Sequence, residues 1–154
     1  MKDKHDFLLN TKFPNFSLKN ETSNLISNDD LLGKWNVIFF YPKDDSPGCT
    51  VESCHFRDNY KSFIENDIGL YGVSTDSIDS HKKFKQKHNL QYSLLSDVGA
   101  ILIKKLNLKK TFNIIRARVT FAIDPSGIIR YVHSSQLNMK GHIHKTLKAV
   151  ARLK

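Results

Sequence analysis

The chain has 154 residues, a length typical of one domain built around one hydrophobic core. Apolar residues make up 40% of it and charged residues 25%, as in an ordinary globular protein, and no apolar stretch approaches the length of a transmembrane helix. The first ten residues carry charges throughout, which argues against a secretory signal. We therefore expect a single domain over residues 1–154 in the cytoplasm, with no membrane partner.

The formal charge is unevenly distributed along the chain. Residues 101–154 carry 12 basic groups and one acidic group, within a net charge of +9 for the whole sequence. A basic segment of this kind can attract nucleic acid. Its lysines, however, alternate with apolar residues as on the solvated face of a helix, and no nucleic-acid-binding motif accompanies them. A physiological nucleic-acid partner is therefore not expected.

The first predicted elements lead up to a buried strand. Residues 13–18 and 24–26 are expected to form a small hairpin, and residues 27–33 one capped helical turn. Residues 36–41 form a short apolar run rich in β-branched and aromatic side chains, which is typical of a strand buried on both faces. Pro42 ends this strand because proline cannot continue a ladder.

A helix is predicted to follow this strand. Ser46 can cap its first turn by accepting a hydrogen bond from a free amide, and Pro47 suits the first helical position because it has no amide hydrogen to leave unpaired. The helix is expected to run to about Asn66 because apolar residues recur at helical spacing, at Phe56, Tyr60, Phe63 and Ile64.

Strands and helices alternate in the rest of the chain, which predicts a parallel sheet with helices on its faces. Residues 104–116 have no predicted conformation. The expected elements are strand 68–74, helix 76–89, strand 92–96, a helix through 100–103 capped by Asp97, strands 119–123 and 128–133 around a tight turn, and a helix from about Met139.

Cys49 falls in the first turn of the helix that begins at Pro47, and this position has chemical meaning. First-turn amides have no partner within the helix, and the helix dipole places partial positive charge there. A thiolate is therefore favoured over a thiol, which makes the cysteine nucleophilic at neutral pH. Gly48 has no side chain to keep a small ligand away from the backbone. The pattern indicates an anionic sulfur that meets a compact polar substrate.

The second cysteine, Cys54, lies five residues further along. On one ideal helix this spacing places the two Cα atoms roughly 8 to 9 Å apart, whereas a disulfide tolerates at most about 7 Å. Cys49 and Cys54 could therefore bond only if the first turns of the helix unwind. We interpret the pair as a device with a folded, reduced state and a locally unfolded, oxidised state.

The residues around Cys49 resemble a known family. Pro42, Ser46 and Cys49 fit the peroxiredoxin signature, and the run from Gly48 to Cys54 resembles the bacterioferritin comigratory protein, or peroxiredoxin Q, branch. The resemblance extends from about residue 11 to the end of the chain. It implies an α/β thioredoxin-like fold with peroxiredoxin N-terminal additions and a central mixed sheet flanked by helices.

The same resemblance implies roles for individual residues. Cys49 corresponds to the peroxidatic cysteine, which attacks a peroxide and becomes a sulfenic acid, and Cys54 to the resolving cysteine that condenses with it. Ser46 takes the position that hydrogen-bonds peroxide and thiolate, and Pro42 the position that shields the pocket. Arg118 matches the arginine that stabilises the thiolate.

Two further assignments complete the implied site. Glu52 matches an acidic residue that orients the arginine in many members, although a glutamate near a helix N-terminus is also favourable without any function. Gly48 is assigned to the substrate side of the pocket. Arg116, two positions before Arg118, points to the same strand face, so the choice of Arg118 depends on the Val-Thr-Phe that follows it.

The expected function is a thiol-dependent peroxidase that reduces hydrogen peroxide and organic hydroperoxides, with no metal or other cofactor. Thioredoxin or a glutaredoxin-like dithiol protein is the expected reductant, and a monomer the expected state. The first alternative is a disulfide oxidoreductase, although four residues separate the cysteines where thioredoxins have two. The second is a redox-sensing or nucleic-acid-binding module that uses the same disulfide as a switch.

The seven histidines do not suggest a metal site. They are scattered, only His142 and His144 are close enough in sequence to share a ligand, and the spacing of the two cysteines is not that of a zinc site. We interpret the histidines as solvated surface residues.

Overall fold

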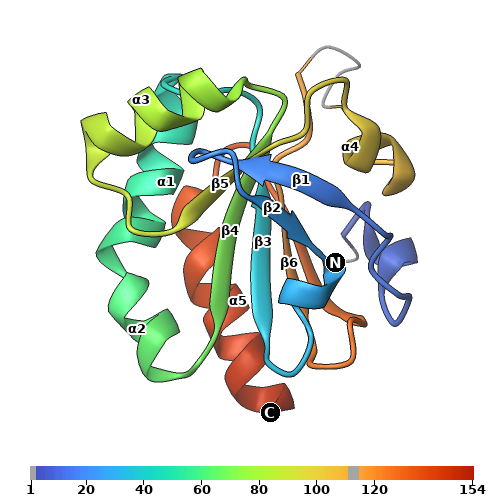
Figure 1. Cartoon of the computed structure of the whole chain (residues 1–154). Helices are drawn as coiled ribbons and strands as arrows, with labels where there is room; N and C mark the ends of the chain where they lie inside the picture. Colours follow the sequence, from blue (N-terminus) through green and yellow to red (C-terminus); the bar gives the residue numbers. More distant parts are fainter. Residues whose placement is uncertain (1–2, 111–114) are drawn as a thin grey trace.

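One seven-stranded sheet runs through the molecule (Figure 1). The structure is a computed structural model, and it describes residues 3–110 and 115–154. The strand order is β2-β1-β5-β4-β3-β6-β7. The elements in chain order are η1 (Asp6–Leu8), β1 (Ser17–Asn20), β2 (Leu25–Ser27), η2 (Asn28–Asp30), β3 (Asn36–Phe40), α1 (Pro47–Asp58), α2 (Tyr60–Glu65), β4 (Gly69–Ser74), α3 (Ile78–His88), β5 (Ser93–Ser96), α4 (Ile101–Lys105), β6 (Val119–Ile123), β7 (Ile129–Ser134) and α5 (Met139–Leu153).

The sheet is mixed. β3, β4 and β5 are parallel neighbours, as the alternation of strands and helices predicted. The strands on either side of this centre pair in the antiparallel sense, β1 and β2 at one edge and β6 and β7 at the other. The antiparallel pairs at the two edges include both predicted hairpins, β1 with β2 and β6 with β7. A mixed sheet is what the family resemblance implied.

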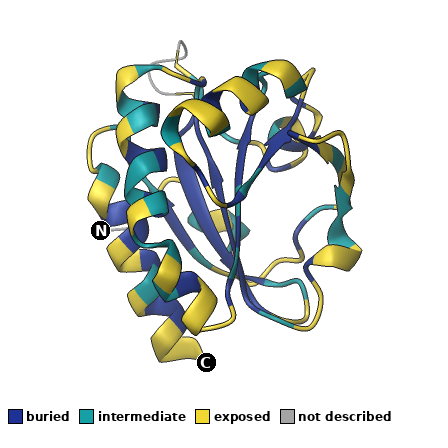
Figure 2. Cartoon of the chain, turned by 60° about the vertical axis from the view of Figure 1, so that its left-hand side comes forward, coloured by how far each residue is buried: buried dark blue, intermediate teal, exposed yellow. Residues whose placement is uncertain are grey.

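Both faces of the sheet are covered, because successive side chains of a strand point to opposite faces. Val37 and Phe39 of β3 belong to one apolar core, together with Ile143 of α5 and residues of α1, α2 and α3. Ile38 and Phe40 belong to a second core, shared with α4 and the N-terminal segments. Figure 2 shows the resulting layers, with the central strands buried and the helices exposing their outer sides.

Most predicted elements are present. Ser27 and Asp30 form a capping box around η2, which confirms the capped turn. Asp97 accepts hydrogen bonds from the backbone amides of Leu102 and Ile103, which confirms its capping role at α4. The first strand of the N-terminal hairpin begins only at Ser17, later than predicted. Of the segment 104–116, residues 111–114 lie outside the described residues.

The predicted long helix is divided at Asn59. Its side-chain amide donates to the carbonyl oxygen of His55 over 2.8 Å, and α2 starts at the next residue. The break changes which residues face the core. Phe56 and Phe63 are fully buried as predicted, but Ile64 is 62% exposed. Within the described part of the chain, no helix is both long and apolar enough to cross a membrane.

Candidate active site

Cys49 lies at the start of the helix that follows the central strand β3. β3 ends at Phe40, the chain turns through a short loop, and α1 starts at Pro47. Ser46 occupies the N-cap position with an extended backbone, and its carbonyl accepts the first helical hydrogen bond from Thr50 over 2.8 Å. Cys49 is the third residue of this helix, so its position in the first turn is confirmed.

Ser46 differs from the prediction in one respect. Its hydroxyl was expected to accept a hydrogen bond from a first-turn amide. Instead, Oγ donates to the carbonyl oxygen of Lys43 over 2.9 Å, across the loop that precedes the helix. Ser46 is half-buried, and its hydroxyl fixes the loop rather than the helix.

Arg118 meets Cys49 because of strand register. β6 pairs antiparallel with β3 so that Val119 lies opposite Phe40, which places Arg118 beside the end of β3. From there Arg118 Nη2 donates to Cys49 Sγ over 3.2 Å, although the two residues are 69 positions apart. Both side chains are buried, with exposed fractions of 5% for Arg118 and 0% for Cys49. Of the two candidate arginines, Arg118 is therefore the one brought to the sulfur.

Glu52 completes an ion pair one helical turn after Cys49. Its Oε1 accepts from Arg118 Nη1 over 2.9 Å, in a position that is fully buried for Glu52. Burial raises the pKa of Glu52 to about 7, against the lowering effect of Arg118. Burial opposes the charge of Arg118, but Glu52 and Cys49 raise its pKa above the ordinary value. One guanidinium thus holds a carboxyl group and a sulfur.

Cys54 lies on the same helix as Cys49, and both cysteines are free. Cys54 is half-buried, and burial raises the pKa of its thiol despite the opposing charge of Arg57. The two thiols therefore have different environments. Cys49 contacts a cation through its sulfur, whereas Cys54 favours the neutral thiol.

The two remaining predicted residues, Pro42 and Gly48, are both half-buried. Pro42 directly follows Tyr41, whose backbone amide donates to the carbonyl oxygen of Val73 just after β3 ends. A Cβ atom on Gly48 would lie 3.2 Å from Arg118 Nη2 and 3.1 Å from Met139 Cε. Gly48 is thus the residue that lets the guanidinium and the methionine of α5 approach the helix.

Sequence reasoning missed a buried histidine in this site. His142 of α5 is fully buried, and its Nδ1 lies 2.7 Å from Thr120 Oγ1 and 3.5 Å from Glu52 Oε2. Its Nε2 lies 2.8 Å from the carbonyl oxygen of Ser135. Burial lowers the pKa of His142 to about 3. The interpretation of the histidines as solvated is wrong here, and equally wrong for His5, His81 and His133.

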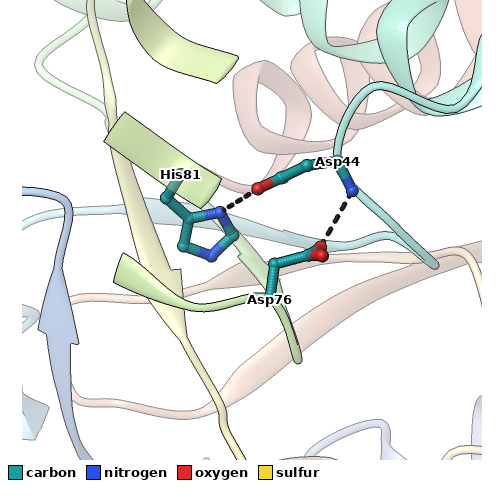
Figure 3. Close-up of side chains that lie close together, drawn as sticks. All are labelled: Asp44, Asp76 and His81. Carbon is teal, nitrogen blue, oxygen red and sulfur yellow. Dashed lines mark hydrogen bonds and ion pairs between the residues drawn. The ribbon is translucent and has the colours of Figure 1, made fainter. Parts of the chain in front are cut away.

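A second buried network fixes the loop before α1, as Figure 3 shows. Asp44 Oδ2 lies 2.7 Å from His81 Nδ1, and Asp44 Oδ1 accepts from the hydroxyl of Tyr41 over 2.6 Å. The backbone amide of Asp44 donates to Asp76 Oδ2 over 2.8 Å. His81 is held in turn by the carbonyl oxygen of Leu95, 3.0 Å from its Nε2. The loop is therefore tied to β5 and α3.

This network could be considered as a metal site, because ligand atoms of Asp44, Asp76 and His81 lie within 4.8 Å of one another. Their contacts indicate another role. Both oxygens of Asp44 and one of Asp76 already interact with hydroxyl, amide or imidazole groups, including Ser74 and Ser80. We therefore assign these residues to anchoring the loop. The sequence offered no periodic signal for it, since the three residues come from separate segments.

Comparisons with known proteins agree with this geometry. Residues 9–132 match the family described as the AhpC/TSA family. The chain is 38% identical over 139 residues to the putative peroxiredoxin bcp of Coxiella burnetii, which covers 86% of this chain and 91% of the relative. It is 36% identical over 141 residues to the chloroplastic peroxiredoxin Q of Oryza sativa subsp. japonica, covering 91% of this chain but only 65% of the relative. The chain thus spans about two thirds of the length of the plant proteins it matches.

Comparison of the fold with solved structures points to the same family. The crystal structure of peroxidoxin BcpB from Mycobacterium tuberculosis superposes with a TM-score of 0.86 at 31% identity, covering 95% of this chain and 97% of that one. This likeness confirms the thioredoxin-like peroxiredoxin fold with a central mixed sheet. The chain belongs to the AhpC/TSA family and, within it, to the group of bcp and peroxiredoxin Q proteins.

Proposed function

We propose that this protein is a thiol-dependent peroxidase that reduces hydrogen peroxide and organic hydroperoxides. The observation that carries the proposal is the 3.2 Å hydrogen bond from Arg118 Nη2 to Cys49 Sγ in a buried helix N-terminus. A cation and unpaired first-turn amides together stabilise negative charge on the sulfur. Family membership supports the same chemistry.

In the first step, the Cys49 thiolate attacks the terminal oxygen of the peroxide. The S–O bond forms as the O–O bond breaks, which oxidises the sulfur to a sulfenic acid. The leaving oxygen takes a proton from solvent and departs as water or an alcohol. The guanidinium of Arg118 stabilises the charge that moves from sulfur to oxygen. Ser46, half-buried beside the helix start, rotates its hydroxyl from Lys43 toward the substrate.

In the second step, Cys54 resolves the sulfenic acid. Its sulfur attacks Cys49 Sγ, the S–S bond forms, and the hydroxyl of the sulfenic acid leaves as water with the proton of Cys54. Both cysteines lie on α1, so this step requires α1 to unwind locally. The raised pKa of the Cys54 thiol keeps it protonated until that unwinding exposes it to solvent.

A dithiol protein such as thioredoxin, or a glutaredoxin-like protein, then reduces the disulfide through a mixed disulfide. Substrate access is beside Gly48, where Arg118 Nη2 and Met139 Cε lie close to the helix backbone, and Pro42 shields the pocket as the family resemblance implies. We propose that the protein acts as a monomer in the cytoplasm.

The decisive test is thioredoxin-coupled consumption of hydrogen peroxide by the wild type, Cys49→Ser and Cys54→Ser, with intact mass after one equivalent of peroxide. We expect turnover to be lost in Cys49→Ser. The wild type should lose the mass of two hydrogens, and Cys54→Ser should hold a sulfenic acid that dimedone traps. Peroxide turnover that survives in Cys49→Ser contradicts the proposal. Reduction of insulin at a rate that exceeds peroxide turnover would favour a disulfide oxidoreductase instead.

A further inference from the structure

A buried polar pair adjoins Arg118. Glu52 uses Oε1 for Arg118, but its Oε2 has no hydrogen-bond partner among the described residues and faces His142 Nδ1 at 3.5 Å. Both side chains are fully buried. A carboxylate oxygen without a donor is unfavourable in the interior of a protein. The protonation of this pair therefore matters for the whole site.

The ring nitrogens of His142 have distinct surroundings. Nε2 lies 2.8 Å from the carbonyl oxygen of Ser135, which can only accept, so Nε2 carries a hydrogen. Nδ1, between Thr120 Oγ1 and Glu52 Oε2, is then the nitrogen at which a proton binds or leaves. One proton fits these contacts in two ways, on Nδ1 facing the carboxylate, or on Oε2 with Nδ1 accepting from the Thr120 hydroxyl. In both cases the pair has no net charge.

The charge of this pair affects Cys49 through Arg118. An ionised Glu52 and a Cys49 thiolate would place two anions on one guanidinium in the interior. When the Glu52–His142 pair is neutral, the Cys49 thiolate is the only anion that the positive charge of Arg118 has to balance at these contacts. The pKa directions agree with a single shared proton up to about neutral pH, because burial raises the pKa of Glu52 to about 7 and lowers that of His142 to about 3.

We propose that His142 is a positioning residue for the reactive thiolate: with Glu52 it holds one proton, and the neutral pair leaves Arg118 free to stabilise Cys49. This inference rests on the proposed role of Cys49. Besides Arg118, three titratable groups act on the same pair from the surrounding elements. His133 of β7 packs its ring edge-on against His142 at 4.5 Å and is itself influenced by Lys145 of α5, and Asp3 of the N-terminal segment also acts on His142. Tyr92, before β5, interacts with Glu52.

The test is the rate of Cys49 alkylation by iodoacetamide from pH 4 to 9, in a Cys54→Ser background. His142→Gln keeps a polar side chain that cannot take up a proton. We expect it to slow alkylation at neutral pH about three- to tenfold, because an ionised Glu52 then competes with the sulfur for the charge of Arg118. His144→Gln, an exposed histidine on the same helix, should leave the profile unchanged.

A double-mutant cycle separates charge neutralisation from a merely structural effect. In a Glu52→Gln background there is no carboxylate to neutralise, so His142→Gln should have no further effect on the alkylation profile. A loss of the same size in both backgrounds, or an unchanged profile in the single variant, overturns the proposal. If the His142→Gln variant does not fold, His142→Asn takes its place, because its shorter amide can occupy the position of Nδ1.

The wild-type chain supplies an independent measurement. In protein labelled with ¹³C at glutamate carboxyl groups, we expect the Glu52 signal, identified by its loss in Glu52→Gln, to titrate together with the His142 ring. Titration of Glu52 near pH 4, independently of His142, overturns the proposal. Neither measurement requires peroxide. Absence of Cys49-dependent peroxide turnover would therefore contradict the proposed function. It can be told apart from absence of a proton shared by Glu52 and His142, which the alkylation and NMR measurements report.

Discussion

Arg118 and Cys49 lie 69 residues apart in sequence and 3.2 Å apart through Nη2 and Sγ. The contact depends on the antiparallel pairing of β3 and β6, which brings the residue before β6 to the loop after β3. A cation is thereby fixed at the end of the sheet, while the sulfur belongs to α1, the helix that unwinds for resolution in the proposed mechanism. The proposed mechanism thus separates a rigid part of the site from a part that moves.

Removing the guanidinium should affect reactivity more than stability. We expect Arg118→Met to slow oxidation of Cys49 by peroxide by about 100-fold or more, because the site loses its charged donor. Arg118→Lys should recover only part of the rate, since a lysine cannot bond Glu52 and Cys49 through two nitrogens in one plane. Stopped-flow oxidation measures both, with Arg116→Met as the matched control. A rate for Arg118→Met within threefold of the control would contradict the assignment.

Gly48→Ala should separate helix stability from site geometry. Alanine favours the helix by about 1 kcal/mol over glycine, so thermal unfolding should show no destabilisation. The new Cβ atom would lie 3.2 Å from Arg118 Nη2, and the guanidinium has to shift away from the sulfur. We expect peroxide oxidation of Cys49 to slow by about tenfold. An unchanged oxidation rate would show that the close approach at Gly48 does not matter.

The raised pKa of Glu52 predicts a pH dependence of stability. With its pKa raised to about 7, Glu52 keeps a proton in the folded chain up to about neutral pH, whereas the unfolded chain loses it near the ordinary value of 4.5. Because Glu52 binds more protons in the folded than in the unfolded state within this window, its own contribution to stability decreases as pH rises through it, by about 3 kcal/mol in total. Glu52→Gln should therefore gain stability relative to the wild type between pH 4 and pH 8.

Urea unfolding at several pH values measures this difference. Glu65→Gln, an exposed glutamate on α2, is the control and should follow the wild-type curve. If the curves of Glu52→Gln and wild type run parallel from pH 4 to pH 8, Glu52 is ionised in the folded state across that range, and the shared proton is absent.

The loop before α1 should depend on Asp44. Asp44→Ala removes the partner of His81 and the acceptor of the Tyr41 hydroxyl in a buried position. We expect the free energy of unfolding in urea to decrease by about 3 kcal/mol, because polar groups remain buried without partners. Asp79→Ala, an exposed aspartate on α3, should change it by less than about 0.5 kcal/mol. Equal stability of the two variants would remove the anchoring role.

Local pattern predicted the elements of this fold well, and contacts between distant segments less well. The apolar run of residues 36–41 and the Ser-Pro helix start are local signals, and both elements are present. The break at Asn59 was missed because a side-chain hydrogen bond to His55 competes with helical periodicity there. As a result, Ile64 was wrongly expected to face the core.

The same contrast between local patterns and distant contacts holds for the site residues. Arg118 was found because a family motif marks it, not because any spacing links it to Cys49. His142 carried no such mark, and its neighbour His144, two positions away, is exposed. The two differ because residues two apart on a helix point to different sides, and only His142 faces α1 and β6. That orientation depends on how α5 packs, which the sequence alone does not specify.

The most direct measurement of the central claim is the second-order rate constant for oxidation of Cys49 by hydrogen peroxide in Cys54→Ser at pH 7, with dimedone to trap the product. If Arg118 and the helix N-terminus activate the sulfur, oxidation should exceed that of a free cysteine thiolate by about 1,000-fold or more, and a single dimedone adduct should form on Cys49. A rate constant equal to that of free cysteine would contradict the account, since a buried thiol held by a cation would then have no peroxidase chemistry.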